Sequence, residues 1–260
     1  MSQNYQTILY EAAPDGVATI TLNRPDRMNS FNQQMLNEFV AVWKQVSETD
    51  SVRAVVLRAA GERAFCTGVD VKEGIDRTSS PFRDEDPSTS LGPKSNRVWK
   101  PIICAVHGMA AGGGFYFINE SDIVICSEEA QFFDPHTSFG MVCAVEPVGL
   151  LGRMPRGEIS RMVLMGNDER ISSATAQRLG LVSEVTPRDQ LWARAHEIAA
   201  LVAAKPAIAI QGTVRALWES RDLPHSQAII NALKYCQIGN ELGTAEVNRA
   251  TAPKAKFKVR

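Results

Sequence analysis

A short apolar run that leads into a glycine triplet limits the folds open to this chain more than any other feature. Residues 101–106 read PIICAV, and Gly108 and the triplet 112–114 follow. An unbroken apolar run of this length predicts a strand that is covered on both faces, as in parallel sheets flanked by helices. Glycines behind such a strand allow a sharp turn into a helix, which we expect to begin within the triplet. The triplet indicates either an anion or oxyanion site or tight packing of strand against helix.

Strands and helices alternate along most of the chain, which predicts an α/β fold. The segments 7–10 and 17–22 flank a turn at Pro14-Asp15-Gly16 and predict a hairpin. Apolar residues between 35 and 46 recur at helical spacing behind possible caps at Asn29 and Ser30. Further strands are expected at 54–57, 101–106, 123–126 and 181–185, and further helices at 148–153, 191–204, 207–219 and 227–241.

Two units follow from this pattern: a core at 1–190 and a helical region at 191–260. The segment 76–97 is rich in Ser, Pro, Asp and Arg, which favours a mobile loop or lid. The helices beyond Pro206 carry apolar residues that a thin helical layer would leave exposed, among them Ile208, Ile210, Leu217 and Trp218. An oligomer is therefore expected.

Composition excludes several classes of protein. The chain has 260 residues, of which 44% are hydrophobic and 22% charged, which excludes disorder and collagen. Lys and Arg number 28 against 29 Asp and Glu, so no global field attracts nucleic acid or an anionic membrane. No secretory signal and no membrane span is recognisable, so a soluble, cytoplasmic protein is expected. The 5 cysteines include no C-x-x-C pair, which argues against disulfides and against a zinc site.

A second glycine turn follows the strand expected at 54–57. Residues 65–72 read FCTGVDVK, and the Gly68 turn is expected to expose the N–H group of Val69. The triplet offers backbone N–H groups of the same kind. The N–H groups of two such turns can both donate a hydrogen bond to one oxygen atom of a ligand.

With these motifs the chain resembles the crotonase, or enoyl-CoA hydratase/isomerase, superfamily over nearly all of its length. The matching segments are ITLNRPDRMNSFN at 20–32, AFCTGVDVKE at 64–73, KPIICAVHGMAAGGG at 100–114, SDIVICSEEAQF at 121–132 and ERISSATAQRLGLVSEV at 169–185. The resemblance implies a spiral of ββα units and a C-terminal helical region that trimerises, with trimers able to pair into hexamers. It also implies an acyl-CoA substrate and no metal or redox cofactor, since coenzyme A is part of the substrate.

By motif position the resemblance assigns Val69 and Gly113 as the two N–H donors that hold the thioester carbonyl and stabilise an enolate. Coenzyme A is expected to bind beside Arg27, Asp70 and Lys72. The alternative for Arg27 and Lys72 is that they are simply exposed cations. The C-terminal Lys254, Lys256 and Phe257 are further candidates, and a solvated basic tail is the alternative for them.

The chain departs from the family at its acid and base residues. Hydratases of the superfamily carry two glutamates, and the matching positions here hold Tyr116 and His136. The remaining acid is Glu146, placed by sequence just before a helix, where isomerases of the superfamily can carry a lone acid. Glu146, His136 and Tyr116 are therefore the catalytic candidates. The alternatives are a helix-capping role for Glu146, a structural loop histidine, and a tyrosine that lines the acyl cavity; Asp134 is expected to cap the backbone.

Three functional classes remain to be compared. An acyl-CoA enzyme that isomerises, or hydrates and dehydrates by an atypical route, fits the motifs best. A peptidase on the same fold needs a serine beside the glycine turn, and Gly114-Phe115-Tyr116 offers none. A non-catalytic CoA-binding or RNA-binding member is the alternative, although the balanced charge speaks against RNA. The expected partners are an acyl-CoA and further copies of the chain, with no nucleic acid and no membrane.

Overall fold

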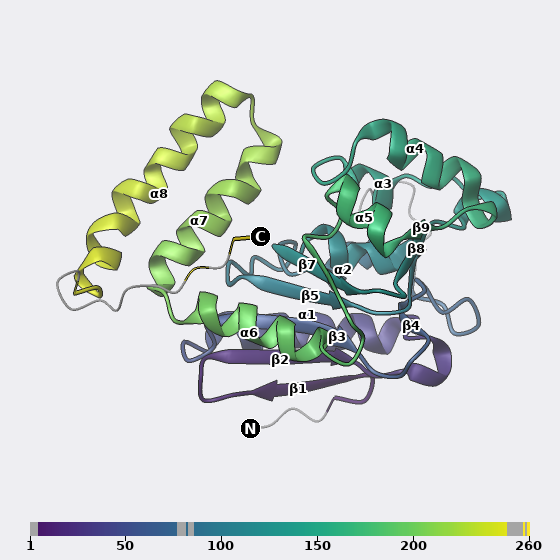
Figure 1. Ribbon diagram of the computed structural model, residues 1–260, viewed down its shortest axis with the longest axis horizontal. Coiled ribbons are helices and arrows are strands. Elements are labelled where there is room, and N and C mark those ends of the chain that lie inside the picture. Colours follow the sequence, from purple (N-terminus) through teal and green to yellow (C-terminus); the bar gives the residue numbers. More distant parts are fainter. Residues whose placement is uncertain (1–4, 77–81, 83–85, 249–256, 258) are drawn as a thin grey trace.

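Two sheets form the centre of the computed structural model, which describes residues 5–76, 82, 86–248, 257, 259 and 260 (Figure 1). The larger sheet has the order β1 (Ile8–Ala12), β2 (Val17–Leu22), β3 (Ala54–Ala59), β5 (Ile102–Val106), β7 (Ile123–Ser127) and β10 (Glu184–Thr186). The smaller sheet has the order β4 (Ala64–Cys66), β6 (Met109–Ala111), β8 (Gln131–Phe133) and β9 (Ile171–Ser172). The mixed α/β fold class predicted from the sequence is confirmed.

The chain passes from the large sheet to the small sheet three times, which produces the expected spiral. β3, β5 and β7 are neighbours in the large sheet, and the strands that follow them, β4, β6 and β8, are neighbours in the small sheet. All of these neighbouring pairs are parallel, while the β1–β2 hairpin is antiparallel as predicted. Every residue of β5 is buried, which explains its unbroken apolar sequence.

Helices cover both faces of the large sheet. The helices are α1 (Gln33–Glu48), α2 (Phe115–Asn119), α3 (Val145–Leu150), α4 (Arg156–Met165), α5 (Ser173–Leu179), α6 (Leu191–Ala203), α7 (Ala207–Glu219) and α8 (His225–Ala245). α1 contributes Phe39 and Trp43 to the main core, where Phe117 of α2 lies 4.9 Å from Phe39 between ring centroids. Ala195 and Ala199 of α6 pack on the opposite face. Full burial of such aromatic side chains contributes roughly 2–3 kcal/mol each.

The start of α1 differs from the expectation. Asn32 caps this helix, because its Oδ1 accepts a hydrogen bond of 3.0 Å from the Met35 N–H. Asn29 instead adopts a left-handed backbone with φ of 52°, and its side-chain amide donates to the carbonyls of Ala60 and Ala64. The predicted caps at Asn29 and Ser30 are therefore wrong, because Asn29 serves a long-range contact that local sequence does not reveal.

The segment 86–97 is packed, which corrects the expected mobile loop for the part that the structure describes. The short helix η2 (Pro87–Leu91) buries Leu91, and the Trp43 Nε1 donates to the Leu91 carbonyl at 2.8 Å. The Glu120 carboxylate accepts from the N–H groups of Lys94 and Ser95. The partners of this segment thus lie on α1 and just past α2, beyond the reach of local composition. Residues 77–81 and 83–85 lie outside the described residues.

The expected helical region at 191–260 divides in two. α6 shares a core cluster with β3 and β5, whereas α7 and α8 lie against each other and extend away from the sheets (Figure 1). The pair presents exposed apolar side chains, namely Leu217, Ile229, Ile230, Leu233, Ile238 and Leu242. Within the described residues no single helix is long and apolar enough to span a bilayer, and α6 and α7 meet that test only as a pair bent by 109°.

Candidate active site

The two glycine turns predicted from the sequence meet where the strands of the small sheet end. Phe31 forms an isolated parallel bridge with Val69: its N–H donates to the Gly68 carbonyl and its carbonyl accepts from the Asp70 N–H. In this geometry the N–H of Val69 points away from Phe31. Gly68 makes the turn possible with a φ of 90°, and a Cβ there would lie 2.9 Å from the Gly113 nitrogen.

Gly113 is the second residue of the short helix η3 (Gly112–Gly114), which forms the second turn and leads from β6 into α2. A Cβ on Gly113 would lie 2.7 Å from the Phe31 ring, so only glycine fits between Phe31 and the Gly68 turn. The first N–H groups of a helix lack partners inside that helix. The structure therefore brings the backbones of Val69 and Gly113 together, as the sequence predicted.

A cavity of about 340 Å³ opens in front of these turns. It contains most of the site residues expected from the sequence together with side chains that the sequence did not single out. The lining residues are Phe31, Val69, Asp86, Ser88, Gly113, Tyr116, His136, Met141, Val142, Ala144, Val145 and Glu146. Neither lysine nor arginine is among these described residues.

An imidazole lies between two carboxylates at one end of the cavity. Asp134, which is fully buried behind β8, accepts hydrogen bonds at its Oδ1 from the His136 backbone N–H at 3.0 Å and from its Nδ1 at 2.6 Å. The His136 Nε2 lies 3.9 Å from the Glu146 Oε1. Asp134 thus caps the backbone as expected, but it also fixes the imidazole and turns Nε2 toward Glu146.

Glu146 is the buried acid of the cavity. The residue lies in the first turn of α3 rather than before the helix, because α3 begins at Val145 and not at Val148. Burial raises the pKa of its carboxyl, and the charges of Asp134 and Asp86 add to the increase, while its own backbone N–H and His136 oppose it. A carboxyl in such a setting is a better proton acceptor than an ordinary surface glutamate.

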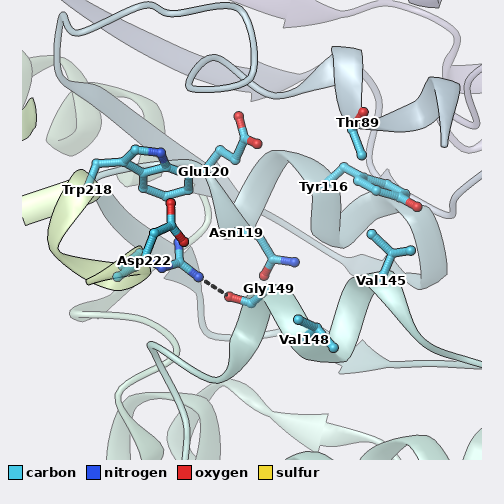
Figure 2. A pocket seen from close by; sticks show the side chains of 10 residues that line it. Thr89, Tyr116, Asn119, Glu120, Val145, Val148, Gly149, Trp218 and Asp222 are labelled. Carbon is cyan, nitrogen blue, oxygen red and sulfur yellow. Dashed lines mark hydrogen bonds between the residues drawn. The ribbon is translucent and has the colours of Figure 1, made fainter. Parts of the chain in front are cut away.

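Tyr116 faces Asp86 across the cavity. Its hydroxyl donates to the Asp86 Oδ2 at 2.9 Å, and the other carboxylate oxygen of Asp86 accepts from the Ser88 N–H. The Tyr116 ring also packs edge-on against Phe31 with centroids 6.5 Å apart. Tyr116 and Val145 line one side of a second cavity, whose volume is about 270 Å³. Trp218 of α7 and Asp222, which follows α7, line the opposite side (Figure 2).

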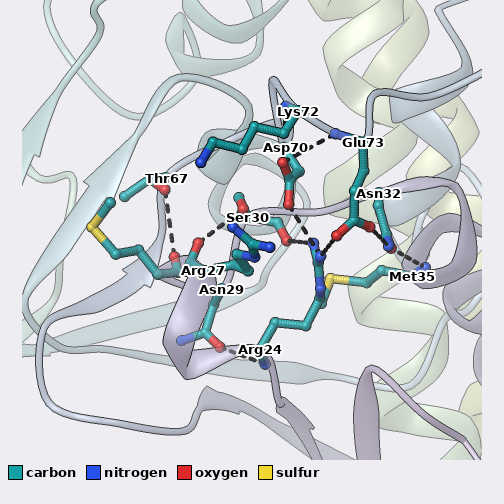
Figure 3. Close-up of polar contacts among 11 residues, drawn as sticks. Arg24, Arg27, Asn29, Ser30, Asn32, Met35, Thr67, Asp70, Lys72 and Glu73 are labelled. Atoms are coloured by element: carbon teal, nitrogen blue, oxygen red, sulfur yellow. Dashed lines mark hydrogen bonds and ion pairs between the residues drawn. The ribbon is translucent and has the colours of Figure 1, made fainter.

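Arg27, Asp70 and Lys72, three of the residues expected to bind coenzyme A, lie in or beside a separate polar cluster (Figure 3). The Arg24 guanidinium lies between the carboxylates of Asp70 and Glu73, 3.0 and 2.6 Å from them (Figure 3). Burial opposes ionisation of Asp70, yet the N–H groups of Lys72 and Glu73 and the Arg24 charge hold the pKa of its carboxyl below its usual range. Asp70 therefore fixes the turn between Val69 and Lys72.

The other residues expected to bind coenzyme A differ in how the structure places them. Arg27 lies in η1 (Pro25–Arg27), and both Arg27 and Lys72 are exposed. Phe257 is exposed, whereas Lys254 and Lys256 lie outside the described residues. The coenzyme A contacts of these residues stay predictions.

Sequence reasoning missed Asp86 and Cys143 and undervalued Asp134. Cys143 is half-buried, and burial together with the charges of Asp134 and Glu146 raises the pKa of its thiol. Asp86 lies 30 residues from Tyr116 in the sequence, so nothing local announces their contact. The motif D-P-H at 134–136 was the one usable signal, because a short helical turn there brings the imidazole back onto the carboxylate.

Together, the fold and the site define a spiral of ββα units whose cavity is bordered by two backbone turns and contains a buried acid. Known proteins share this architecture. A family model described as enoyl-CoA hydratase/isomerase matches residues 12–235. The (E)-benzylidenesuccinyl-CoA hydratase of Thauera aromatica is 32% identical over 219 residues, covering 82% of this chain and 83% of that protein. The 1,2-epoxyphenylacetyl-CoA isomerase of Escherichia coli K12 is 33% identical over 204 residues, or 74% of each chain.

Solved structures agree with these matches. An enoyl-CoA hydratase/isomerase from Mycobacterium paratuberculosis superposes with a TM-score of 0.82 at 38% identity over 90% of each chain. The enoyl-CoA hydratase of Bacillus anthracis gives a TM-score of 0.79 at 26% identity over 94% of this chain and 93% of that chain. The chain belongs to the enoyl-CoA hydratase/isomerase family, and it is an enzyme of that family, a lyase or an isomerase.

The close approach of the two turns generates a prediction for Gly68→Ala. The left-handed backbone costs about 1–2 kcal/mol for alanine, and the overlap with the Gly113 nitrogen adds about 1–3 kcal/mol. Gly74→Ala is the matched control, because Gly74 has a φ of 68° but no atom within 4 Å of an added Cβ. Denaturant unfolding should show a loss of about 3 kcal/mol for Gly68→Ala and about 1 kcal/mol for Gly74→Ala. Equal losses would mean that the turns do not touch.

Proposed function

We propose that this enzyme moves a proton along the acyl chain of a CoA thioester through an enolate. The observation that carries the proposal is Glu146, a buried carboxyl with a raised pKa that faces the same cavity as the Val69 and Gly113 turns. The relatives from Thauera aromatica and Escherichia coli are both named for CoA thioesters, which supports this substrate class.

The proposed step uses the two backbone N–H groups to polarise the thioester carbonyl. Glu146 takes a proton from the α carbon, the C–H electron pair moves onto the thioester oxygen, and the Val69 and Gly113 donors stabilise the negative charge. Return of the proton at the γ carbon shifts the double bond. One preorganised donor of this kind lowers a barrier by roughly 3–4 kcal/mol in a well-studied case.

His136 supports Glu146 in this proposal. Because Asp134 accepts from Nδ1, the Nε2 is the nitrogen that faces Glu146, 3.9 Å away. The imidazole can thereby share the transferred proton or hold the carboxylate in place. Tyr116, whose ring contacts Phe31, orients Asp86 and separates the two cavities, so that the acyl group extends past it.

Substrate binding and assembly complete the proposal. The exposed cations Arg27 and Lys72 bind the phosphates of coenzyme A, and the C-terminal Lys256 and Phe257 add contacts to it. The enolate step itself uses no metal or redox cofactor. The exposed apolar side chains of α7 and α8 pair with those of other copies in a trimer or a hexamer.

A single substitution tests the proposed base. Glu146→Gln keeps the size of the side chain and removes the basic carboxylate, so we expect turnover of β,γ-enoyl-CoA thioesters to fall by about 100-fold or more with little change in affinity. Incorporation of solvent deuterium into the bound thioester should fall in parallel. His136→Ala should have the smaller effect.

Glu158→Gln is the matched control, because Glu158 also lies in the first turn of a helix, α4, but away from the cavity. It should exchange deuterium and turn over like the parent enzyme. A Glu146→Gln enzyme that does the same would eliminate Glu146 as the base, and a loss confined to His136→Ala would move the assignment to the imidazole. Equal binding of an acyl-CoA and its free acid in calorimetry would refute the substrate class.

The charge of Asp86 predicts a shift in pH dependence. A base works in its ionised form, so kcat/KM should rise with pH through the raised pKa of Glu146, and Asp86 is one of the charges that raise it. Asp86→Asn should therefore move the acidic limb of the profile to lower pH. Asp189→Asn, an exposed acid at the start of α6, should leave the limb in place. A shift in the opposite direction would contradict the assignment.

Assembly is tested by sedimentation of the full chain. The apolar side chains exposed on α8, such as Ile230 and Leu233, predict a species of three or six chains at micromolar concentration. Leu233→Glu should shift the population toward monomer, since a buried unpaired charge is costly at an interface. A parent protein that sediments only as a monomer would refute the proposal.

A further inference from the structure

The second cavity continues from the one that contains Glu146. Tyr116 and Val145 line both cavities, whereas Val148 lines the second and not the first. Glu146 and Val148 both belong to α3, so one short helix borders the two spaces. A ligand that is bound at the two backbone turns can therefore extend past Tyr116 and Val145 into the second cavity.

Trp218 of α7 gives the second cavity an aromatic wall (Figure 2). Arg221 lies in η6 (Ser220–Asp222), the short helix that follows α7, and its guanidinium carbon is 4.4 Å from the centre of the Trp218 ring. The Nη2 of Arg221 donates to the Gly149 carbonyl of α3 at 2.9 Å. Arg221 thus connects the end of α7 to α3 and packs on the indole through a cation–π contact, which holds the aromatic wall in place.

Most polar residues of the second cavity already have partners within the protein. The Thr89 hydroxyl donates to a backbone carbonyl at 2.7 Å, and the Asn119 amide donates to another at 3.0 Å. The Glu120 carboxylate accepts from two backbone N–H groups at 2.7 and 2.9 Å. Asp222 is exposed, so water can solvate its carboxylate. The surface that remains for a ligand is therefore mostly apolar and aromatic.

The size and the chemistry of the second cavity favour an aromatic ring. Its volume is about 270 Å³, and an apolar cavity of about 150 Å³ is already large enough to bind benzene. A ring placed between Tyr116 and Trp218 can pack offset or edge-on against their rings, which stabilises aromatic pairs beyond the effect of buried area. A flexible aliphatic chain makes no such contact and loses more conformational freedom when it binds.

We propose that the second cavity binds the aromatic ring of an aryl-substituted acyl-CoA, and that Trp218 determines this specificity. The thioester carbonyl lies at the Val69 and Gly113 turns, and the ring lies between Tyr116 and Trp218. The inference rests on the proposed function, because it assumes that the acyl group of a CoA thioester occupies the first cavity. It does not depend on which residue moves the proton.

Calorimetry with saturated thioesters tests the proposal without turnover. The probes are phenylacetyl-CoA, 3-phenylpropanoyl-CoA and 4-phenylbutanoyl-CoA, each compared with the thioester that carries cyclohexyl in place of phenyl. At the best chain length the parent should bind the phenyl thioester about 3–10-fold more tightly, because cyclohexyl makes no aromatic contact. Trp218→Ala should remove this preference and leave the affinity for butanoyl-CoA unchanged. Trp218→Phe, which keeps an aromatic ring, should retain most of the preference.

A second variant tests the cavity itself. Val148→Phe fills the second cavity from α3 and leaves the lining of the first unchanged. It should weaken binding of the preferred phenyl thioester by about 10-fold or more, since even one methylene group in an apolar pocket can change selectivity by that factor. Butanoyl-CoA, which is too short to fill the second cavity, should bind as it does to the parent.

Leu201→Ala is the matched control, because Leu201 is an exposed apolar residue of α6 and lines neither cavity. It should bind every thioester like the parent. Equal affinity of the parent for phenyl and cyclohexyl thioesters at all three chain lengths would overturn this inference and leave the proposed function in place. A preference for phenyl that survives both Trp218→Ala and Val148→Phe would do the same. A parent that binds none of the thioesters would overturn both the inference and the proposed substrate class.

Discussion

The contact between two backbone turns is the constraint on which the rest of this structure depends. The Gly68 turn and the triplet 112–114 approach so closely that a Cβ on Gly114 would lie 2.5 Å from the Cys66 carbonyl oxygen, and one on Gly68 would meet the Gly113 nitrogen. Such an approach is possible only because β4 and β6 are adjacent parallel strands that end side by side. The spiral of strands between two sheets therefore positions two N–H groups without using any side chain, and the side chains of the cavity are left to vary.

Several carboxylates lie in or behind the wall of the cavity in this chain. This chain has an imidazole held by Asp134 and a tyrosine held by Asp86. Asp134 is buried behind the imidazole, Asp86 lines the cavity beside Tyr116, and Glu146 contributes a third carboxylate from α3. Burial opposes the ionisation of Glu146, and the charges of Asp134 and Asp86 add to that effect, so the pKa of its carboxyl is raised and its carboxylate is a stronger proton acceptor than a surface glutamate.

The sequence was most informative where a local pattern coincided with a long-range requirement. β2 was predicted to the residue because a glycine turn precedes it and N-R-P follows it. β5 was predicted one residue too long, at 101–106, from its unbroken apolar sequence, which reflects burial of every residue of the strand. The caps of α1 and the segment 86–97 were mispredicted because Asn29, Leu91 and Glu120 have partners far away in the sequence. The glycines themselves indicated the two backbone turns, and the resemblance supplied the candidate donors Val69 and Gly113, whereas the Asp86 to Tyr116 contact joins residues 30 positions apart and carries no local signal.

The choice between the two carboxylates that face the cavity can be argued from their hydrogen bonds. Asp86 accepts from the Ser88 N–H with one oxygen and from the Tyr116 hydroxyl with the other, so each of its oxygens already has a hydrogen-bond partner. Glu146 has the His136 Nε2 at 3.9 Å, too far for a hydrogen bond, and its ionised form is opposed by burial. Hydration needs one group to hold a water molecule and another to deprotonate it. With Asp86 held by Tyr116, the proposed assignment of Glu146 as the base needs no second carboxylate, and a proton shuttle is the reaction that a single base can carry out.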